Sequence, residues 1–256
     1  MSGSETRSIE LEQHVDASPD DVWAALTTVE GLKQWFVVDA RIDPKIGGAL
    51  WISWGPGSEG EAPIHAWEPG RHFGWTENYG DDAEGRPIRV VVDFEIEGGD
   101  GGTTLRLVQS GFSADAQWDE MYDALVDGWT YFLFNLAHYL GRHAGTPRAL
   151  AWKRAKTELD RHATWERLVG AGLAAPSSAG ESVDLSIGGS MSANVVSSRP
   201  GYHFAATLPD LDDSILFVEL EGKHVGFWLS AYGTASDSAT DLQSALDERI
   251  EEALRA

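Results

Sequence analysis

The chain has 256 residues, of which 42% are hydrophobic, and its 41 acidic and 19 basic residues give a formal net charge of −22. This length allows one large domain or two small ones, and the acidic charge argues against nucleic acid or an anionic membrane as a partner, because both would repel the protein. The absence of cysteine excludes disulfides, thiolate metal sites and cysteine nucleophiles.

Neither a targeting nor a membrane-spanning segment is evident. Residues 1–7 are polar and lack the apolar run of a signal peptide. The apolar stretch Trp129–Leu140 is interrupted by Asn135 and His138, which makes it too short and too polar to cross a bilayer. We therefore expect a cytoplasmic protein.

The chain begins with a strand and two short helices. Alternation over Ser8–Val15 predicts a half-buried strand. Residues Ser18–Asp21 supply a serine cap, a proline in the first helical position and two acids in the first turn, which is a strong helix start. Gly31 opens a second short helix that ends near Trp35 and Phe36.

A run of antiparallel strands and one long helix follow. The predicted strands are Leu50–Trp54, Ile64–Glu68, Arg71–Tyr79, Arg89–Glu97 and Thr103–Ser110. The glycine-rich segment Gly98–Gly102 predicts a hairpin loop between the last two. From Asp115 to Arg142, large apolar residues recur every three or four positions, which predicts an amphipathic helix.

Four segments in this order resemble one superfamily. They are SPDDVWAALTTVEGLKQWF (18–36), IGGALWISW (46–54), EPGRHFGWT (68–76) and DGWTYFLFNLAHYLG (127–141). Residues 8–143 resemble the SRPBCC (START-like, Bet v 1-like) superfamily, and the last segment resembles its branch related to the C-terminal domain of the Hsp90 ATPase activator. The resemblance implies an α+β helix-grip fold, in which a curved antiparallel sheet wraps the long helix and leaves a cavity. It implies no single activity, because the superfamily includes lipid carriers, hormone receptors, polyketide cyclases and co-chaperones.

The second half of the chain, residues 150–256, repeats motifs of the first in the same order. The matches are Ile46–Gly48 with Ile187–Gly189, Pro69–Phe73 with Pro200–Phe204, Phe94–Gly98 with Val218–Gly222, and Trp23 with Trp165. We interpret this half as a shortened, degenerate copy of the helix-grip domain, joined by the linker Ala144–Leu150.

The first strand has no clear counterpart in this copy. Leu150–Arg161 is expected to be helical instead. A sheet without that strand would expose an edge, so we expect the copy to pack on the first domain or to form a homodimer.

Aromatic and apolar side chains of the first domain are the candidate ligand contacts. Large rings can fill an interior or line a pocket for a hydrophobic molecule, and the family resemblance favours the pocket. The candidates are Trp35, Phe36, Trp51, Trp54, Trp67, Phe73, Trp75, Phe94, Trp118, Tyr122, Leu125, Trp129 and Phe132.

Polar side chains on the same strands could orient such a ligand, or could simply face solvent. They are Glu77, Asn78, Arg89, Asp93, Arg106 and Gln109. Alternation places Asp93 on the face opposite Val92 and Phe94, so its environment depends on which face is inside.

The eight histidines show no metal-ligand spacing. His72 and His203 follow matching Pro-Gly turns, which favours a structural role in the turn, and His65 is a lone strand histidine with the same interpretation. G-x-S-x-G, P-loop and dinucleotide-binding motifs are absent. We expect no metal and no cofactor, and we name no catalytic residue.

Three functions remain open. The first is a non-catalytic protein that binds a small hydrophobic or aromatic molecule. The second is a cyclase- or hydrolase-like enzyme that uses a carboxylate or histidine of the cavity. The third is a co-chaperone-like interaction module, whose acidic surface would bind a basic partner in a salt-sensitive way.

Overall fold

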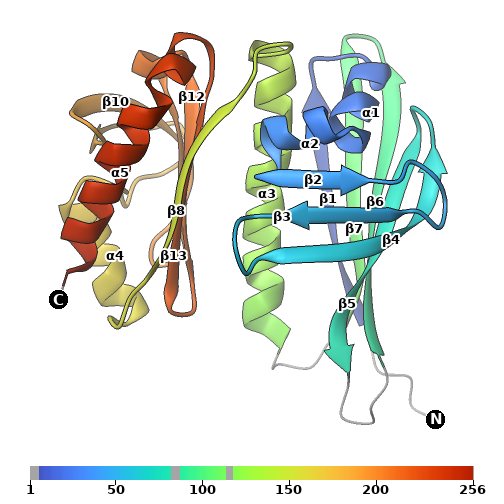
Figure 1. The fold of residues 1–256 in the computed structure, drawn as a ribbon, viewed down its shortest axis with the longest axis horizontal. Coiled ribbons are helices and arrows are strands. Elements are labelled where there is room, and N and C mark those ends of the chain that lie inside the picture. Colours follow the sequence, from blue (N-terminus) through green and yellow to red (C-terminus); the bar gives the residue numbers. More distant parts are fainter. Residues whose placement is uncertain (1–5, 82–86, 114–117, 256) are drawn as a thin grey trace. The chain divides into compact units, whose positions relative to one another are not determined.

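A computed structural model describes residues 6–81, 87–113 and 118–255, and the chain divides into two compact units after Ala144. The first unit is an α+β domain with a single sheet (Figure 1). Its elements are β1 (Thr6–Val15), α1 (Pro19–Thr27), α2 (Val29–Trp35), β2 (Asp39–Ile42), β3 (Ala49–Ser53), β4 (Glu59–Glu68), β5 (His72–Asp81), β6 (Pro87–Gly99), β7 (Gly102–Ser113) and α3 (Asp119–Arg142).

The seven strands form one antiparallel sheet in the order β1-β7-β6-β5-β4-β3-β2. The long helix α3 packs against it, which confirms the predicted helix-grip architecture (Figure 1). Trp129, Leu133, Leu136 and Leu140 of α3 belong to the buried core. The predicted start of this helix at Asp115 lies outside the described residues.

Alternation along the strands defines an inner and an outer face of the sheet. On β6, Val90, Val92, Phe94 and Ile96 are buried in the core beneath α3, and the residues between them point the other way. Asp93 therefore lies on the outer face.

Helix α1 begins as the sequence predicts, whereas α2 begins at Val29, two residues before the predicted start at Gly31. Ser18 caps α1, because its Oγ accepts a hydrogen bond from the backbone N–H of Asp21 at 3.2 Å. Thr28 ends α1 and caps α2, since its Oγ1 accepts from the N–H of Gly31 at 2.9 Å. The helices therefore turn sharply at one residue, which brings Gly31 against the backbone of α1.

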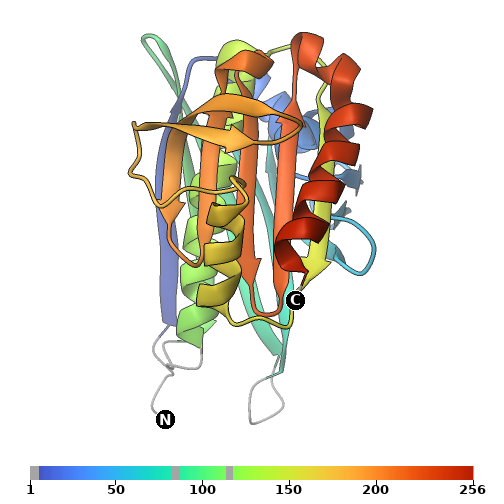
Figure 2. The same ribbon diagram turned by 90° about the vertical axis from the view of Figure 1, so that its left-hand side faces the viewer.

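The second unit has six strands in the order β8-β13-β12-β11-β10-β9, and Figure 2 shows α4 and α5 on the same face of this sheet. Its elements are β8 (Ala149–Lys156), α4 (Arg161–Gly170), β9 (Ser182–Ser186), β10 (Ser190–Arg199), β11 (His203–Leu208), η2 (Pro209–Leu211), β12 (Ser214–Glu221), β13 (His224–Ala231), η3 (Gly233–Ser238) and α5 (Ala239–Leu254).

The expectation of a helix over Leu150–Arg161 is wrong. Residues Ala149–Lys156 form strand β8, which pairs with β13 along its whole length, and helix α4 begins only at Arg161. Alanine, lysine and arginine favour a helix in isolation, but pairing with a neighbouring strand overrides that weak preference. Strand β8 is the counterpart of β1 that the sequence was expected to lack. The second sheet is therefore not left incomplete at this edge, which was the reason for expecting it to pack on the first domain or to form a homodimer.

The Pro-Gly turn and the strand after it occupy matching positions in the two sheets, whereas Ile46–Gly48 precedes β3 and Ile187–Gly189 precedes β10, which is the counterpart of β4. His72 lies opposite Glu95 between β5 and β6, and His203 lies opposite Glu219 between β11 and β12. The strand order also matches, except that the second sheet has one strand fewer. These observations support the proposal that the second unit is a shortened copy of the first.

No helix within the described residues combines the length and the apolar character needed to cross a bilayer.

Two helix glycines of the first unit are expected to respond in opposite ways to alanine. A Cβ at Gly31 would lie 2.4 Å from the carbonyl oxygen of Ala24, so Gly31→Ala must push α1 and α2 apart and cost about 1–3 kcal/mol of unfolding free energy. A Cβ at Gly128 on α3 meets nothing within 4 Å, so Gly128→Ala is expected to stabilise the protein by about 1 kcal/mol through helix propensity. Denaturant unfolding of both variants measures the difference, and equal effects would contradict it.

Candidate functional site

The inner face of the first sheet and α3 enclose a cluster of aromatic rings centred on Phe36. The ring of Trp35 stacks on Phe36 at 4.9 Å, and that of Trp129 stacks on it at 5.4 Å. Trp54 and Phe132 approach the same ring edge-on at 5.3 and 4.9 Å. Residues from α2, from α3 and from the segment directly after β3 thus meet at one phenylalanine, in the stacked and edge-to-face geometries that aromatic rings prefer.

Most of the predicted ligand contacts lie in or against this core. The fully buried ones are Trp35, Phe36, Phe73, Trp75, Phe94 and Trp129. Those that are partly buried and packed against the core are Trp54, Trp67, Tyr122, Leu125 and Phe132. The half-buried rings are the part of the cluster that a molecule entering from solvent could reach.

Two predicted contacts lie elsewhere. Trp51 is on the opposite face of β3, because its neighbours Leu50 and Ile52 occupy the inward positions, and the guanidinium of Arg41 lies 4.0 Å from its ring centre. Trp118 is half-buried at the N-cap of α3 and is not a member of the core cluster.

Polar side chains interrupt the inner face beside the aromatic rings. Trp75 donates from Nε1 to Glu77 Oε1 at 2.8 Å, and Trp129 donates from Nε1 to Gln109 Oε1 at 2.8 Å. The Tyr79 hydroxyl lies close to the side chains of both Glu77 and Gln109, which act on its pKa. Burial raises the pKa of the Tyr79 hydroxyl, and the neighbouring Glu77 carboxylate raises it further, so this hydroxyl stays protonated and remains a donor. The five residues form one connected inner network.

Alternation explains which polar candidates point inward. On β5 the inward positions are Phe73, Trp75, Glu77 and Tyr79, and on β7 Gln109 is fully buried. The other polar candidates lie on the outer face or are exposed: Asn78, Arg89, Asp93 and Arg106. Tyr79 is not among the predicted contacts, although it lies four residues after Trp75 and therefore on the same face of the strand.

Two buried polar atoms near the Phe36 cluster have no hydrogen-bond partner among the described residues. They are Nε1 of Trp54 and Oδ1 of Asn135, whose Nδ2 donates to the carbonyl oxygen of Trp35 at 2.5 Å. A buried donor or acceptor left unpaired costs about 1–3 kcal/mol. Water or a ligand atom at these positions would remove that cost.

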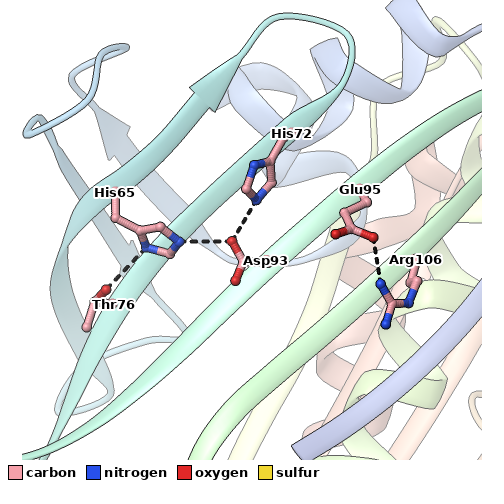
Figure 3. A network of polar contacts seen from close by, with 6 residues as sticks. All are labelled: His65, His72, Thr76, Asp93, Glu95 and Arg106. Carbon is pink, nitrogen blue, oxygen red and sulfur yellow. Dashed lines mark hydrogen bonds and ion pairs between the residues drawn. The ribbon is translucent and has the colours of Figure 1, made fainter.

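The outer face carries a separate polar network, shown in Figure 3. Asp93 Oδ1 accepts from His65 Nε2 at 2.9 Å and from His72 Nε2 at 2.7 Å. Both Nε2 atoms donate, because a carboxylate oxygen can only accept, and the Nδ1 of His65 shares a hydrogen bond with Thr76 Oγ1 at 3.2 Å. Nearby, Arg106 pairs with Glu95 at 2.7 Å.

Gly74 makes this outer network possible. It lies between His65 and Asp93 on the central strand, where a Cβ would come 2.5 Å from Asp93 Oδ1 and 2.7 Å from His65 Nε2. A register shift between Ile64 and Ala66 on β4 places a bulge at His65. The interpretation of His72 as a turn residue missed this contact, because His72 and Asp93 are 21 residues apart.

The second unit builds the same ladder without this network. Ala205 occupies the position of Gly74 and lies opposite Phe217, just as Gly74 lies opposite Asp93. His203 contacts Ser197 Oγ through Nε2 at 2.7 Å. The fold therefore does not require the network. Among residues 6–81, 87–113 and 118–255, no group of three or more histidine, aspartate or glutamate side chains is arranged to hold a metal ion.

Replacing Gly74 with alanine is expected to break the outer network. The new methyl group would displace His65 and Asp93, so we expect Gly74→Ala to lower the unfolding free energy by about 1–3 kcal/mol. Gly60→Ala is the matched control, because Gly60 lies in β4 of the same sheet and its Cβ would meet nothing within 4 Å. Chemical denaturation measures the stability, and imidazole NMR resonances report whether both histidines leave Asp93. Unchanged histidine resonances in Gly74→Ala would refute this geometry.

Comparison with known proteins places the first unit. Solved structures similar to it include protein MLL2253 from Mesorhizobium loti, with 28% identity and a TM-score of 0.47 over 53% of this chain and 98% of that chain. The Aha1 dimer from Colwellia psychrerythraea has 23% identity and a TM-score of 0.45 over 52% of this chain and 96% of that chain. A protein from Staphylococcus saprophyticus, SSP2350, has 17% identity and a TM-score of 0.46 over 54% and 93%.

No curated protein matches the sequence. The family model described as Activator of Hsp90 ATPase homolog 1-like protein matches residues 16–141, which lie within the first unit. The first unit is therefore an Activator of Hsp90 ATPase homolog 1-like domain of the SRPBCC superfamily.

Proposed function

We propose that the first unit binds, in the cytoplasm, a small molecule with an apolar or aromatic body between α3 and the inner face of the sheet. The observation that carries this proposal is the mixture of polar groups and aromatic rings on that face. The inner network and the unpartnered Nε1 of Trp54 lie among buried rings. A core that only needs filling gains nothing from buried polar atoms, whereas a binding site uses a few of them to orient its ligand.

The aromatic cluster would supply most of the affinity. Burying an aromatic group removes about 150–250 Å² from water, which at about 25 cal/mol per Å² corresponds to about 4–6 kcal/mol before the costs of association. The half-buried rings of Trp54, Tyr122 and Phe132 are positioned to make this contact. The network formed by Glu77, Tyr79 and Gln109 would then select the orientation of the ligand.

A protein-binding role is the second candidate, and the family match favours it. The family is named for an activator of the Hsp90 ATPase, and one similar solved structure is a dimer of Aha1. A net charge of −22 would attract a basic surface, so such an association would weaken as salt is raised. A pull-down with this protein as bait, at low and at high salt, tests whether a basic partner is retained only at low salt. Light scattering on the purified protein measures separately whether it forms a homodimer.

Ligand binding is tested with the neutral fluorescent probe N-phenyl-1-naphthylamine. We expect its emission to rise on binding and the tryptophan emission to fall. Phe132→Ala removes a half-buried ring of the cluster. We expect this variant to bind the probe about tenfold more weakly, which corresponds to a loss of about 1.4 kcal/mol in binding free energy. Trp51→Ala is the control, because Trp51 lies on the opposite face of the sheet, and it is expected to leave the affinity unchanged.

Thermal melting of both variants confirms that they are folded. The binding proposal fails if neither this probe nor a panel of neutral aromatic and aliphatic molecules changes either emission. It also fails if Trp51→Ala lowers the affinity for the probe as much as Phe132→Ala does.

A further inference from the structure

Arg7, near the start of β1, has a guanidinium group that is only partly paired. Its Nη1 forms an ion pair with Asp119 at 2.7 Å, and its Cζ lies 4.3 Å from the centre of the Tyr122 ring. Its Nε and Nη2 are buried and have no hydrogen-bond partner among the described residues. Two donors of a permanent cation are thus shielded from water, with no acceptor among residues 6–81, 87–113 and 118–255.

These two atoms form one edge of the guanidinium plane. Their N–H bonds are parallel and match the two oxygens of a carboxylate, which is the bidentate geometry that makes arginine the preferred residue for such groups. Burying charged donors without an acceptor is costly, so the arrangement favours a bound group that supplies two oxygens. Asp119 cannot satisfy this edge, because its ion pair is to the other nitrogen, Nη1.

A run of aromatic rings extends from Arg7 toward the inner network. Phe112, which pairs with Arg7 between β1 and β7, lies 5.7 Å from the Tyr122 ring and 6.3 Å from the Tyr79 ring. Tyr79 in turn lies close to the side chains of Glu77 and Gln109. The Tyr122 hydroxyl donates to the carbonyl oxygen of Ser8 at 2.7 Å, which fixes its ring beneath the guanidinium.

We propose that Arg7 binds the carboxylate of the ligand, whose apolar body lies along the half-buried ring of Tyr122. This inference rests on the proposed function and narrows it to an aromatic or aliphatic carboxylic acid. Glu77 lies beyond Tyr79 at the other end of the aromatic run, so charge repulsion directs the carboxylate toward Arg7.

The acidic surface does not prevent this binding. Exposed charges are screened beyond about 8 Å at physiological salt, whereas the Arg7 edge would act at hydrogen-bond distance in a partly buried place. The net charge of −22 would slow the approach of an anion without removing the contact that holds it.

The test compares three ligands that share one ring system. Naphthalene-2-carboxylate, naphthalene-2-carboxamide and 2-naphthylmethylamine are each used to displace N-phenyl-1-naphthylamine from the full chain. We expect the carboxylate to bind at least about tenfold more tightly than the carboxamide, and the amine to bind more weakly than both. 2-Naphthyl phosphate is included to distinguish a carboxylate site from a general anion site, and phosphate binding as tight as the carboxylate would overturn the assignment to carboxylic acids.

Variants assign the preference to Arg7. Arg7→Lys keeps the positive charge but loses the pair of parallel donors, and Arg7→Gln loses both the charge and the pair. We expect each variant to bind the carboxylate and the carboxamide equally well. Binding of the neutral probe is expected to be retained. Arg41→Gln is the matched control, because the Arg41 guanidinium also lies over an aromatic ring but on the outer face. Thermal melting verifies that each variant is folded.

The outcomes separate the two proposals. If the neutral probe binds but the carboxylate and carboxamide bind equally, or if Arg41→Gln removes the preference as well, the role of Arg7 is overturned and the proposed function stands. If no probe binds to the wild-type chain, the proposed function itself fails.

Discussion

The packing of Trp129 on α3 against the inner face of the sheet holds the first unit together. Its ring stacks on Phe36 at 5.4 Å and meets Phe94 edge-on at 5.8 Å, and its Nε1 donates to Gln109 at 2.8 Å. One side chain therefore joins the long helix to the segment after α2, to β6 and to β7. The hydrogen bond also gives this contact a direction, which purely apolar packing lacks.

Local signals in the sequence were sufficient to predict most of the first unit. Ser18 and Thr28 cap helices through contacts within three residues. The strand alternation depends on neighbours two positions apart, and it correctly separates Val92 and Phe94 from Asp93. The same rule, read on β3, puts Leu50 and Ile52 inside and Trp51 outside, but selection by residue type grouped Trp51 with the ligand contacts. The error arose because the candidates were chosen by the size of the side chain, without regard to the face of the strand on which each one lies.

The remaining features depend on contacts between distant residues. His65 meets Asp93 across 28 positions, and Arg7 meets Asp119 across a whole domain. Strand β8 is a strand because β13 pairs with it, although its alanine and lysine content favours a helix. Such pairings cannot be read from one chain, so the aromatic candidates and Glu77 and Gln109 were predicted, whereas Tyr79 and the buried edge of Arg7 were not.

The different fillings of the two sheets imply different evolutionary freedom. The first interior is built from aromatic rings and polar atoms that fit one another in specific orientations, whereas the second is mostly aliphatic, with leucine, valine and alanine around Phe204 and Phe227. Aliphatic side chains of similar volume replace one another at little cost, but an indole that both stacks and donates a hydrogen bond has no close substitute. Across related chains the second interior can therefore drift, while substitutions in the first are held to a narrow set by the geometry of its rings and hydrogen bonds.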